Sequence, residues 1–195
     1  MGYPFLIDVA ILKFFNLKIA CPPFDFFFLT ITDFHIWRWP IALSIVLLLW
    51  RGGAKARWMI LLAIITAVII DPTVYYLIKP LIARLRPCHE PALAWIRTID
   101  GCGGKYGFPS SHASNVFGMV MIIGSFYKSS RYYLYPIAIL VALSRVYLGL
   151  HYPSDILGGA VYGMLIASIV IFLIRIIAQN HVAKYFVDVN NISQK

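Results

Sequence analysis

Long apolar runs separated by short polar connections dominate the pattern of this chain. Residues 58–78 form an almost unbroken apolar stretch, and at about 1.5 Å per helical residue it reaches roughly the 30 Å thickness of a bilayer core. Four further runs have the same character, at 36–50, 112–127, 132–150 and 155–174. The pattern predicts an all-α, integral-membrane bundle of five transmembrane helices, or six if residues 24–34 form another span.

The first 35 residues predict a different kind of element, because charged residues interrupt their apolar runs too often for a clear span. We expect residues 3–18 to form a helix that lies in the membrane interface. Its lipid-facing side chains would be Phe5, Leu6, Val9, Leu12, Phe14 and Phe15. No signal for a cleavable leader peptide is evident at this end. The expected organisation is one membrane-embedded domain over 1–195, with N-terminal helices at 1–35, the bundle at 36–178 and a cytoplasmic tail at 179–195.

The composition supports a membrane protein. Hydrophobic residues make up 61% of the 195, and the mean hydropathy is +0.78, well beyond an ordinary soluble domain. The net charge of +9 could suggest nucleic acid, but the basic residues gather in short connections and after the last run, so we expect no such partner. These residues are Arg51, Lys55, Arg57, Lys128, Arg131, Arg175 and Lys184.

The distribution of positive charge also predicts the topology. The positive-inside rule places the basic connections in the cytoplasm. Alternate spans then bring the long 79–111 connection and the 151–155 turn together on the extracytoplasmic side of the cytoplasmic membrane. Every remaining polar fragment of interest falls on that side.

The first such fragment follows the 58–78 run. Lys79 and Arg86 could be ordinary interfacial residues whose charged ends reach the headgroups. However, Pro87 biases the backbone of Arg86 to an extended conformation and so fixes where its guanidinium points. A fixed guanidinium fork suits bidentate capture of phosphate oxygens.

The second fragment, Pro109-Ser110-Ser111-His112, precedes an apolar helical run. Serine is a favoured helix N-cap, and the first helical turn offers unpaired N–H groups that stabilise an anion. A capped helix with an interfacial histidine is the alternative. His112 is of interest because an imidazole titrates near neutral pH and can donate a proton to a leaving oxygen.

The third fragment comprises Ser144-Arg145 and, after a short gap, His151 and Asp155. A histidine and an aspartate four residues apart can bring the carboxylate to one ring nitrogen and leave the other free to attack. Alternatively, Asp155 only caps the last helix while His151 anchors at the interface. The two roles of Asp155 are compatible.

Together the three fragments resemble the signature of the type-2 phosphatidic acid phosphatase superfamily, the integral-membrane lipid phosphate phosphatases. That signature contains a lysine followed after six residues by Arg-Pro, then Pro-Ser-Gly-His, and finally Ser-Arg, five residues, a histidine, three residues and an aspartate. The matching residues are Lys79, Arg86-Pro87, Pro109-Ser110, His112, Ser144-Arg145, His151 and Asp155. Ser111 departs from the pattern, since the family usually has glycine there. A serine costs nothing if the backbone is already helical at that point, which we expect.

The resemblance implies a role for each matched position. His151 resembles the nucleophile that accepts the phosphoryl group, Asp155 its orienting partner, and His112 the general acid. The implied phosphate ligands are Lys79, Arg86, Ser110, Ser111 and Arg145. The implied partner is a phosphorylated lipid in the bilayer, such as a lipid A phosphate, undecaprenyl diphosphate or phosphatidylglycerol phosphate. No metal and no cofactor is required.

Other polar residues have competing interpretations. Cys88 and Cys102 lie in the extracytoplasmic connection, where an oxidising compartment permits a disulfide, although two free thiols are the alternative. Asp71, followed by Pro72, could cap a restarted helix or mark an ion pathway. His89 and Glu90 could bind a metal, but the spacing suggests no third ligand.

Three rival functions follow from these alternatives. A small transporter or channel would use Asp71 and the extracytoplasmic histidines as an ion path. A catalytically silent protein would bind lipid phosphates without releasing phosphate. Soluble vanadium haloperoxidases share the same kind of signature, but the hydropathy of this chain argues against them.

Overall fold

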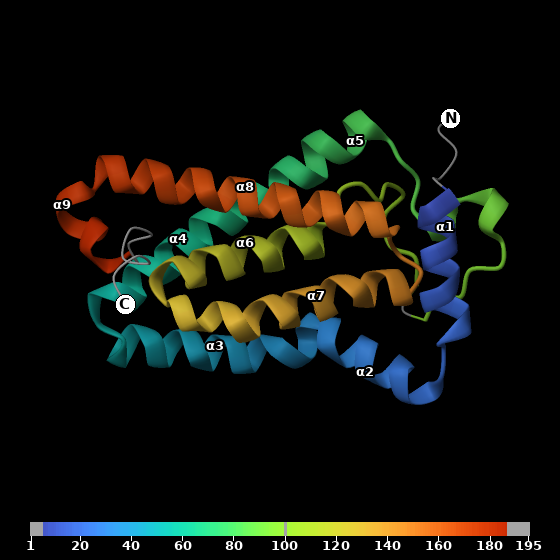
Figure 1. The fold of residues 1–195 in the computed structure, drawn as a ribbon, viewed down its shortest axis with the longest axis horizontal. Coiled ribbons are helices and arrows are strands. Elements are labelled where there is room, and N and C mark those ends of the chain that lie inside the picture. The colour runs from blue at the N-terminus through green and yellow to red at the C-terminus, as the bar shows by residue number, and fades with distance from the viewer. Residues whose placement is uncertain (1–5, 100, 187–195) are drawn as a thin grey trace, which may run out of the picture.

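The computed structural model describes residues 6–99 and 101–186, and helices make up most of this part (Figure 1). The longer helices are α2 (Pro22–Thr32), α3 (Phe34–Arg51), α4 (Gly53–Pro72), α6 (Ser111–Phe126), α7 (Arg131–Tyr147) and α8 (Pro153–Ile177). Shorter helices are α1 (Leu6–Lys13), α5 (Lys79–Ile82) and α9 (Gln179–Val182). Single turns are the π-helical η1 (Phe14–Lys18) and η2 (Thr73–Ile78) and the 3-10 turns η3 (Pro87–His89), η4 (Pro91–Leu93), η5 (Lys128–Ser130) and η6 (Ala183–Tyr185). The all-α prediction is confirmed.

Helix α6 lies inside the bundle and packs most extensively against α8 (Figure 1). Two glycines of α8 allow the backbones to approach closely. A Cβ at Gly163 would lie 1.9 Å from the carbonyl oxygen of Ser114, and one at Gly159 would lie 2.5 Å from that of Ser110. These glycines therefore bring the first turn of α6, where one of the polar fragments lies, close against α8.

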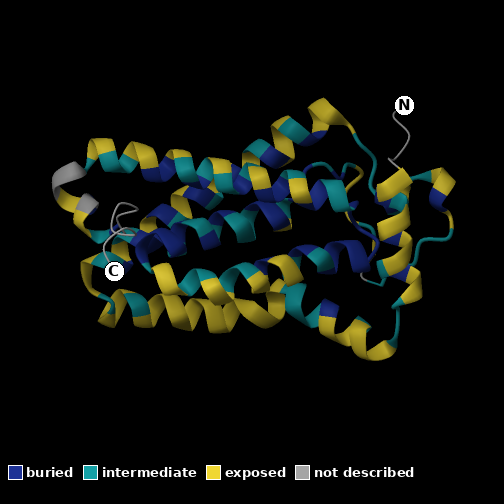
Figure 2. Cartoon of the chain, in the orientation of Figure 1, coloured by how far each residue is buried: buried dark blue, intermediate teal, exposed yellow. Residues whose placement is uncertain are grey.

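Helix α3 lies at the periphery of the bundle. None of its residues is buried, and Figure 2 shows it as an almost continuous exposed surface. Its exposed side chains are largely apolar, among them Leu43, Val46 and Leu49. Such a surface suits contact with lipid tails.

The expected count of five to six spans is not confirmed. By length and composition, the helical stretches Gly53–Ile82 and Pro153–Ile177 can cross a membrane. The bent pair Leu6–Lys18 and Pro22–Thr32 adds a third crossing if it forms a single span. Helices α6 and α7 have only 16 and 17 residues, less than the roughly 20 that cross a bilayer alone. Helix α6 begins and helix α7 ends among the polar fragments. Their apolar runs are therefore short, because polar residues take the place of apolar ones there.

The N-terminal segment is less superficial than predicted. Residues 24–34 do not make an independent span, because α2 has 11 residues and meets the helix over 6–18 at a bend of 115°. The expected lipid-facing side of 3–18 is wrong at Leu12, which is fully buried, although Leu6 and Phe14 are exposed. Phe5 lies outside the described residues, as does the part of the expected tail beyond 186. Helix α1 crosses one end of the bundle (Figure 1).

The capping role predicted for Asp71 is also wrong. The helix does not restart at Pro72 but continues from α4 through the π-helical turn η2 into α5. The Asp71 carboxylate instead accepts a hydrogen bond of 2.6 Å from the side-chain amide of Asn115 in α6. Pro72 lacks an N–H and so weakens the regular helical ladder, and the wider π turn follows directly after it.

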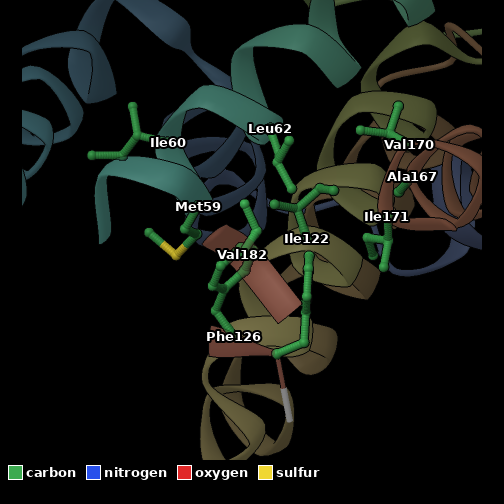
Figure 3. Close-up of a cluster of buried hydrophobic side chains, with 10 residues drawn as sticks. Met59, Ile60, Leu62, Ile122, Phe126, Ala167, Val170, Ile171 and Val182 are labelled. Carbon is green, nitrogen blue, oxygen red and sulfur yellow. The ribbon is translucent and has the colours of Figure 1, made fainter. Parts of the chain in front are cut away.

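An apolar cluster fills the opposite end of the bundle from α1. It joins α4, α6, α8 and the short elements after α8, as Figure 3 shows for Met59, Ile122, Phe126 and Ile171. Phe126 is fully buried and its ring lies 4.7 Å from that of Phe186. The basic connections after α3, α6 and α8 all lie at this end (Figure 1).

Candidate active site

The three polar fragments meet at the end of the bundle that α1 crosses (Figure 1). Lys79 begins α5, His112 lies in the first turn of α6, Arg145 lies in the last turn of α7, and Asp155 lies in the first turn of α8. Two fragments are directly joined, because the Ser110 N–H donates to the carbonyl oxygen of Asp155 at 3.0 Å. Five of the polar side chains are buried: Lys79, Ser110, Arg145, His151 and Asp155.

A short backbone pairing fixes Arg86. The Arg86 N–H donates to the Lys105 carbonyl at 3.1 Å, and the Gly107 N–H donates to the Arg84 carbonyl at 2.8 Å. The Arg86 guanidinium donates to the carbonyls of Tyr106 and Cys102, at 3.3 and 3.2 Å. Gly107 must remain small, because a Cβ there would lie 2.8 Å from Oδ2 of Asp155.

His151 and Asp155 form a fully buried pair. Nδ1 of His151 lies 3.4 Å from Oδ2 of Asp155, and the same oxygen accepts the Tyr152 N–H at 3.0 Å. Asp155 thus both caps α8 and faces the imidazole, and this arrangement unites the two alternatives for its role. Nδ1 faces Asp155, so Nε2 is the ring nitrogen that does not contact this carboxylate, and the imidazole also has a hydrogen bond with the backbone of Gly107.

Positive charge surrounds His151. Burial lowers the pKa of His151 well below its ordinary value, and three nearby cations lower it further. These cations are Arg86, Lys79 and Arg145. The neutral imidazole that results carries a free lone pair, and the cations around it suit an oxyanion.

The first turn of α6 completes the cluster. Ser110 is the N-cap, and its hydroxyl oxygen accepts the Ala113 N–H at 3.5 Å. Ser111 is the first residue of α6, so its helical backbone needs no glycine and the departure from the family pattern costs nothing there. His112 is exposed, whereas His151 is buried.

Three site residues were not predicted from the sequence. Arg84 donates to Oδ1 of Asp155 at 2.8 Å and to Oδ2 of Asp8 at 2.7 Å. Thr32 accepts a hydrogen bond of 3.1 Å from the Arg145 guanidinium. Asp8 offered a signal, because a carboxylate within the apolar run of a membrane-associated helix requires a partner.

A disulfide closes the connection between α5 and α6. Cys88 and Cys102 are bonded, with their Cα atoms 5.9 Å apart. Among the described residues, three that could bind a metal ion have their possible ligand atoms close together: Cys88, His89 and Cys102. Because the disulfide occupies both sulfurs, these residues do not form a metal site in this state.

The comparisons with known proteins agree with this geometry. The model of the PAP2 superfamily matches residues 56–179. The lipid A 4'-phosphatase of Bacteroides thetaiotaomicron is 32% identical over 167 residues, covering 80% of this chain and 72% of that protein. The enzyme of the same name from Porphyromonas gingivalis is 28% identical over 172 residues, covering 85% and 73%.

The fold is shared as well. The crystal structure of Aquifex aeolicus LpxE matches with a TM-score of 0.67 at 20% identity, covering 86% of this chain and 96% of that one. The family match spans more than half of the chain and contains all three polar fragments. This multi-pass membrane protein therefore belongs to the PAP2 superfamily.

Proposed function

We propose that this protein hydrolyses a phosphate ester or diphosphate of a membrane lipid through a phosphohistidine on His151. The observation that carries the proposal is the buried His151–Asp155 pair, at 3.4 Å, beside three cations from separate parts of the fold. Lys79 comes from α5, Arg86 from the connection after it and Arg145 from α7. A transferring phosphoryl group spreads negative charge over its equatorial oxygens, and preorganised cations stabilise that charge.

The reaction proceeds in two steps. Nε2 of His151 attacks phosphorus while the bond to the leaving oxygen breaks, and His112 protonates that oxygen. His112 then takes a proton from water, the water oxygen attacks phosphorus, and the phosphorus–nitrogen bond breaks to release phosphate and free His151. The exposed position of His112 supports this assignment, because the acid must reach both a bulky lipid and water.

We assign the phosphate contacts to Lys79, Arg86 and Arg145, with Ser110, Ser111 and the helix N-terminus completing the cradle. Lys79 and Arg145 are almost fully buried, so their charges are poorly screened and act strongly on a bound anion. No metal and no cofactor enters either step.

The proposed substrate class is a phosphorylated glycolipid of the lipid A type. The two relatives covering 80% and 85% of this chain carry the name lipid A 4'-phosphatase. Undecaprenyl diphosphate and phosphatidylglycerol phosphate are the competing substrates.

We further propose that the protein lies in the cytoplasmic membrane with the site on the extracytoplasmic face. The basic connections gather at the end of the bundle opposite the site (Figure 1), which supports this orientation. Lys105 is exposed beside the site, so Lys105→Cys should react with a membrane-impermeant maleimide in intact cells. Protection until the membrane is opened would reverse the orientation.

A panel of lipid mono- and diphosphates, offered to purified protein with a chelator present, tests the activity. Wild type should release phosphate and His151→Ala should release none. Lipid binding without release would indicate a silent binding protein, and ion flux that survives His151→Ala would indicate a transporter. The preferred lipid decides among the three substrate classes.

A further inference from the structure

The carboxylate of Asp155 faces two partners with its two oxygens. Oδ2 receives the Tyr152 N–H and faces His151, as described above, while Oδ1 accepts a hydrogen bond of 2.8 Å from Arg84. Asp155 is fully buried. A buried carboxylate is costly without a compensating cation, and Arg84 supplies that charge at the oxygen that does not face the imidazole.

Arg84 is itself held in one orientation. Its guanidinium donates to Oγ of Ser154 at 2.6 Å and to Asp8 at 2.7 Å, and it lies 4.3 Å from the ring centroid of Tyr152. Its backbone carbonyl is fixed by Gly107. Two carboxylates therefore contact the Arg84 guanidinium, whereas the Arg86 guanidinium donates to the backbone carbonyls of Tyr106 and Cys102.

The second carboxylate comes from the N-terminal helix. Asp8 is 5% exposed, and its Oδ1 accepts the Ser154 N–H at 2.9 Å, while Oδ2 accepts from the Ser154 hydroxyl and from Arg84. The buried residues of α1 are Asp8 and Leu12. Since positions four apart share one helical face, α1 turns a single leucine and a single carboxylate toward the bundle.

We propose that Arg84 and Asp8 are positioning residues that hold Asp155 in the geometry with which it orients His151. Charges alternate along the chain of contacts from Asp8 through Arg84 to Asp155, so each group neutralises and aims the next. Helix α1 lies outside the residues that match the family model, and through Asp8 it becomes a part of the active site. This inference rests on the proposed function.

The first test compares Asp8→Asn with Asp25→Asn. Both substitutions remove one carboxylate from an N-terminal helix, and Asp25 pairs with Arg97 at 2.8 Å much as Asp8 pairs with Arg84 at 2.7 Å. We expect Asp8→Asn to lower kcat about 10-fold or more with KM changed less than about 3-fold. Asp25→Asn should leave kcat within about 2-fold, because Asp25 pairs with Arg97 and Tyr147 and not with Arg84.

The second test uses Arg84→Lys and Arg84→Met. Lysine keeps the positive charge and should recover part of kcat relative to methionine, whereas a purely structural role would make the two alike at equal Tm. An increase in KM with unchanged kcat in Arg84→Met would show that Arg84 binds phosphate, and would overturn the proposal.

The outcomes separate this inference from the proposed function. If wild type releases no phosphate, the proposed function fails. If wild type is active but Asp8→Asn and Asp25→Asn behave alike, or if lysine gives no recovery at position 84, the positioning role fails. Should Asp8→Asn not fold, the two Arg84 variants decide alone.

Discussion

The two ends of the bundle differ in the kind of side chain that they bury. At the end crossed by α1, buried polar groups such as Lys79, Arg145 and Asp155 are held close together, an arrangement that tends to cost stability. At the other end, Phe126, Ile122 and their neighbours form a purely apolar cluster (Figure 3). The contrast indicates that one end carries the chemistry while the other carries much of the packing that holds the helices in register.

After His151→Ala, the largest expected effect at the polar end comes from Lys79→Met. This change keeps the length of the side chain but removes a buried charge that lies among Arg86 and Arg145. We expect kcat/KM for phosphate release to fall about 10²- to 10³-fold. The Tm in detergent should stay the same or rise, because repulsion between cations is relieved. A fall in Tm that accounts for the lost activity would remove the distinction between the two ends.

The disulfide offers a sharper test, because it lies at the polar end and yet is structural. Cys88 and Cys102 are 14 positions apart in the sequence. Opening the bond between them should lower the free energy of unfolding by about 3 kcal/mol in the chain-entropy model. KM should also rise, since the Arg86 guanidinium is held by the Cys102 carbonyl. Enzyme assays and unfolding of Cys88→Ser/Cys102→Ser measure both effects. An unchanged KM would show that Arg86 is placed by its other contacts alone.

The matching change at the apolar end is Phe126→Ala. It deletes a fully buried ring that contacts Phe186, and we expect a loss of about 2 kcal/mol. This is below the usual cost in a water-soluble core, because apolar groups gain less by leaving lipid than by leaving water. The activity of the folded fraction should be unchanged. A selective loss of kcat would mean that the apolar cluster transmits strain to the site.

The sequence was sufficient to predict that the polar residues of the candidate site lie together at one end of the bundle. Apolar runs marked where α4 and α8 cross the bundle, and the basic connections separated its two ends. Because His151 and Asp155 are four residues apart at a helix start, their contact was also predictable from local geometry. Long-range information came from the motif, which links Lys79 to residues more than 60 positions away.

The remaining features depend on tertiary contacts that leave no periodic signal. Leu12 was expected to face lipid because an apolar side chain suits lipid and protein interior equally. Arg84 lies in the unspecified interval of the motif, and only its contacts with Asp155 and Asp8 distinguish it from a headgroup-binding arginine. Likewise, Asp71 and Asn115 meet across two helices, which no spacing within either helix could predict.

The smallest expected effect is a pH dependence of stability that arises at the polar end alone. Burial and the charges of Arg86, Lys79 and Arg145 hold the pKa of His151 well below the ordinary value of 6.5, so the unfolded chain binds a proton at this residue that the folded protein does not. Below pH 6.5, the contribution of His151 to stability should therefore fall as the pH falls, by about 1 kcal/mol between pH 6.5 and 5.5. Unfolding in detergent micelles at these two pH values measures the change, and His151→Gln should reduce it by that amount. Phe126→Ala should leave the difference between the two pH values as it is in wild type, since it removes no titratable group. If His151→Gln retained the full slope, the imidazole would be protonated in the folded state, and a neutral nucleophile would no longer be available at neutral pH.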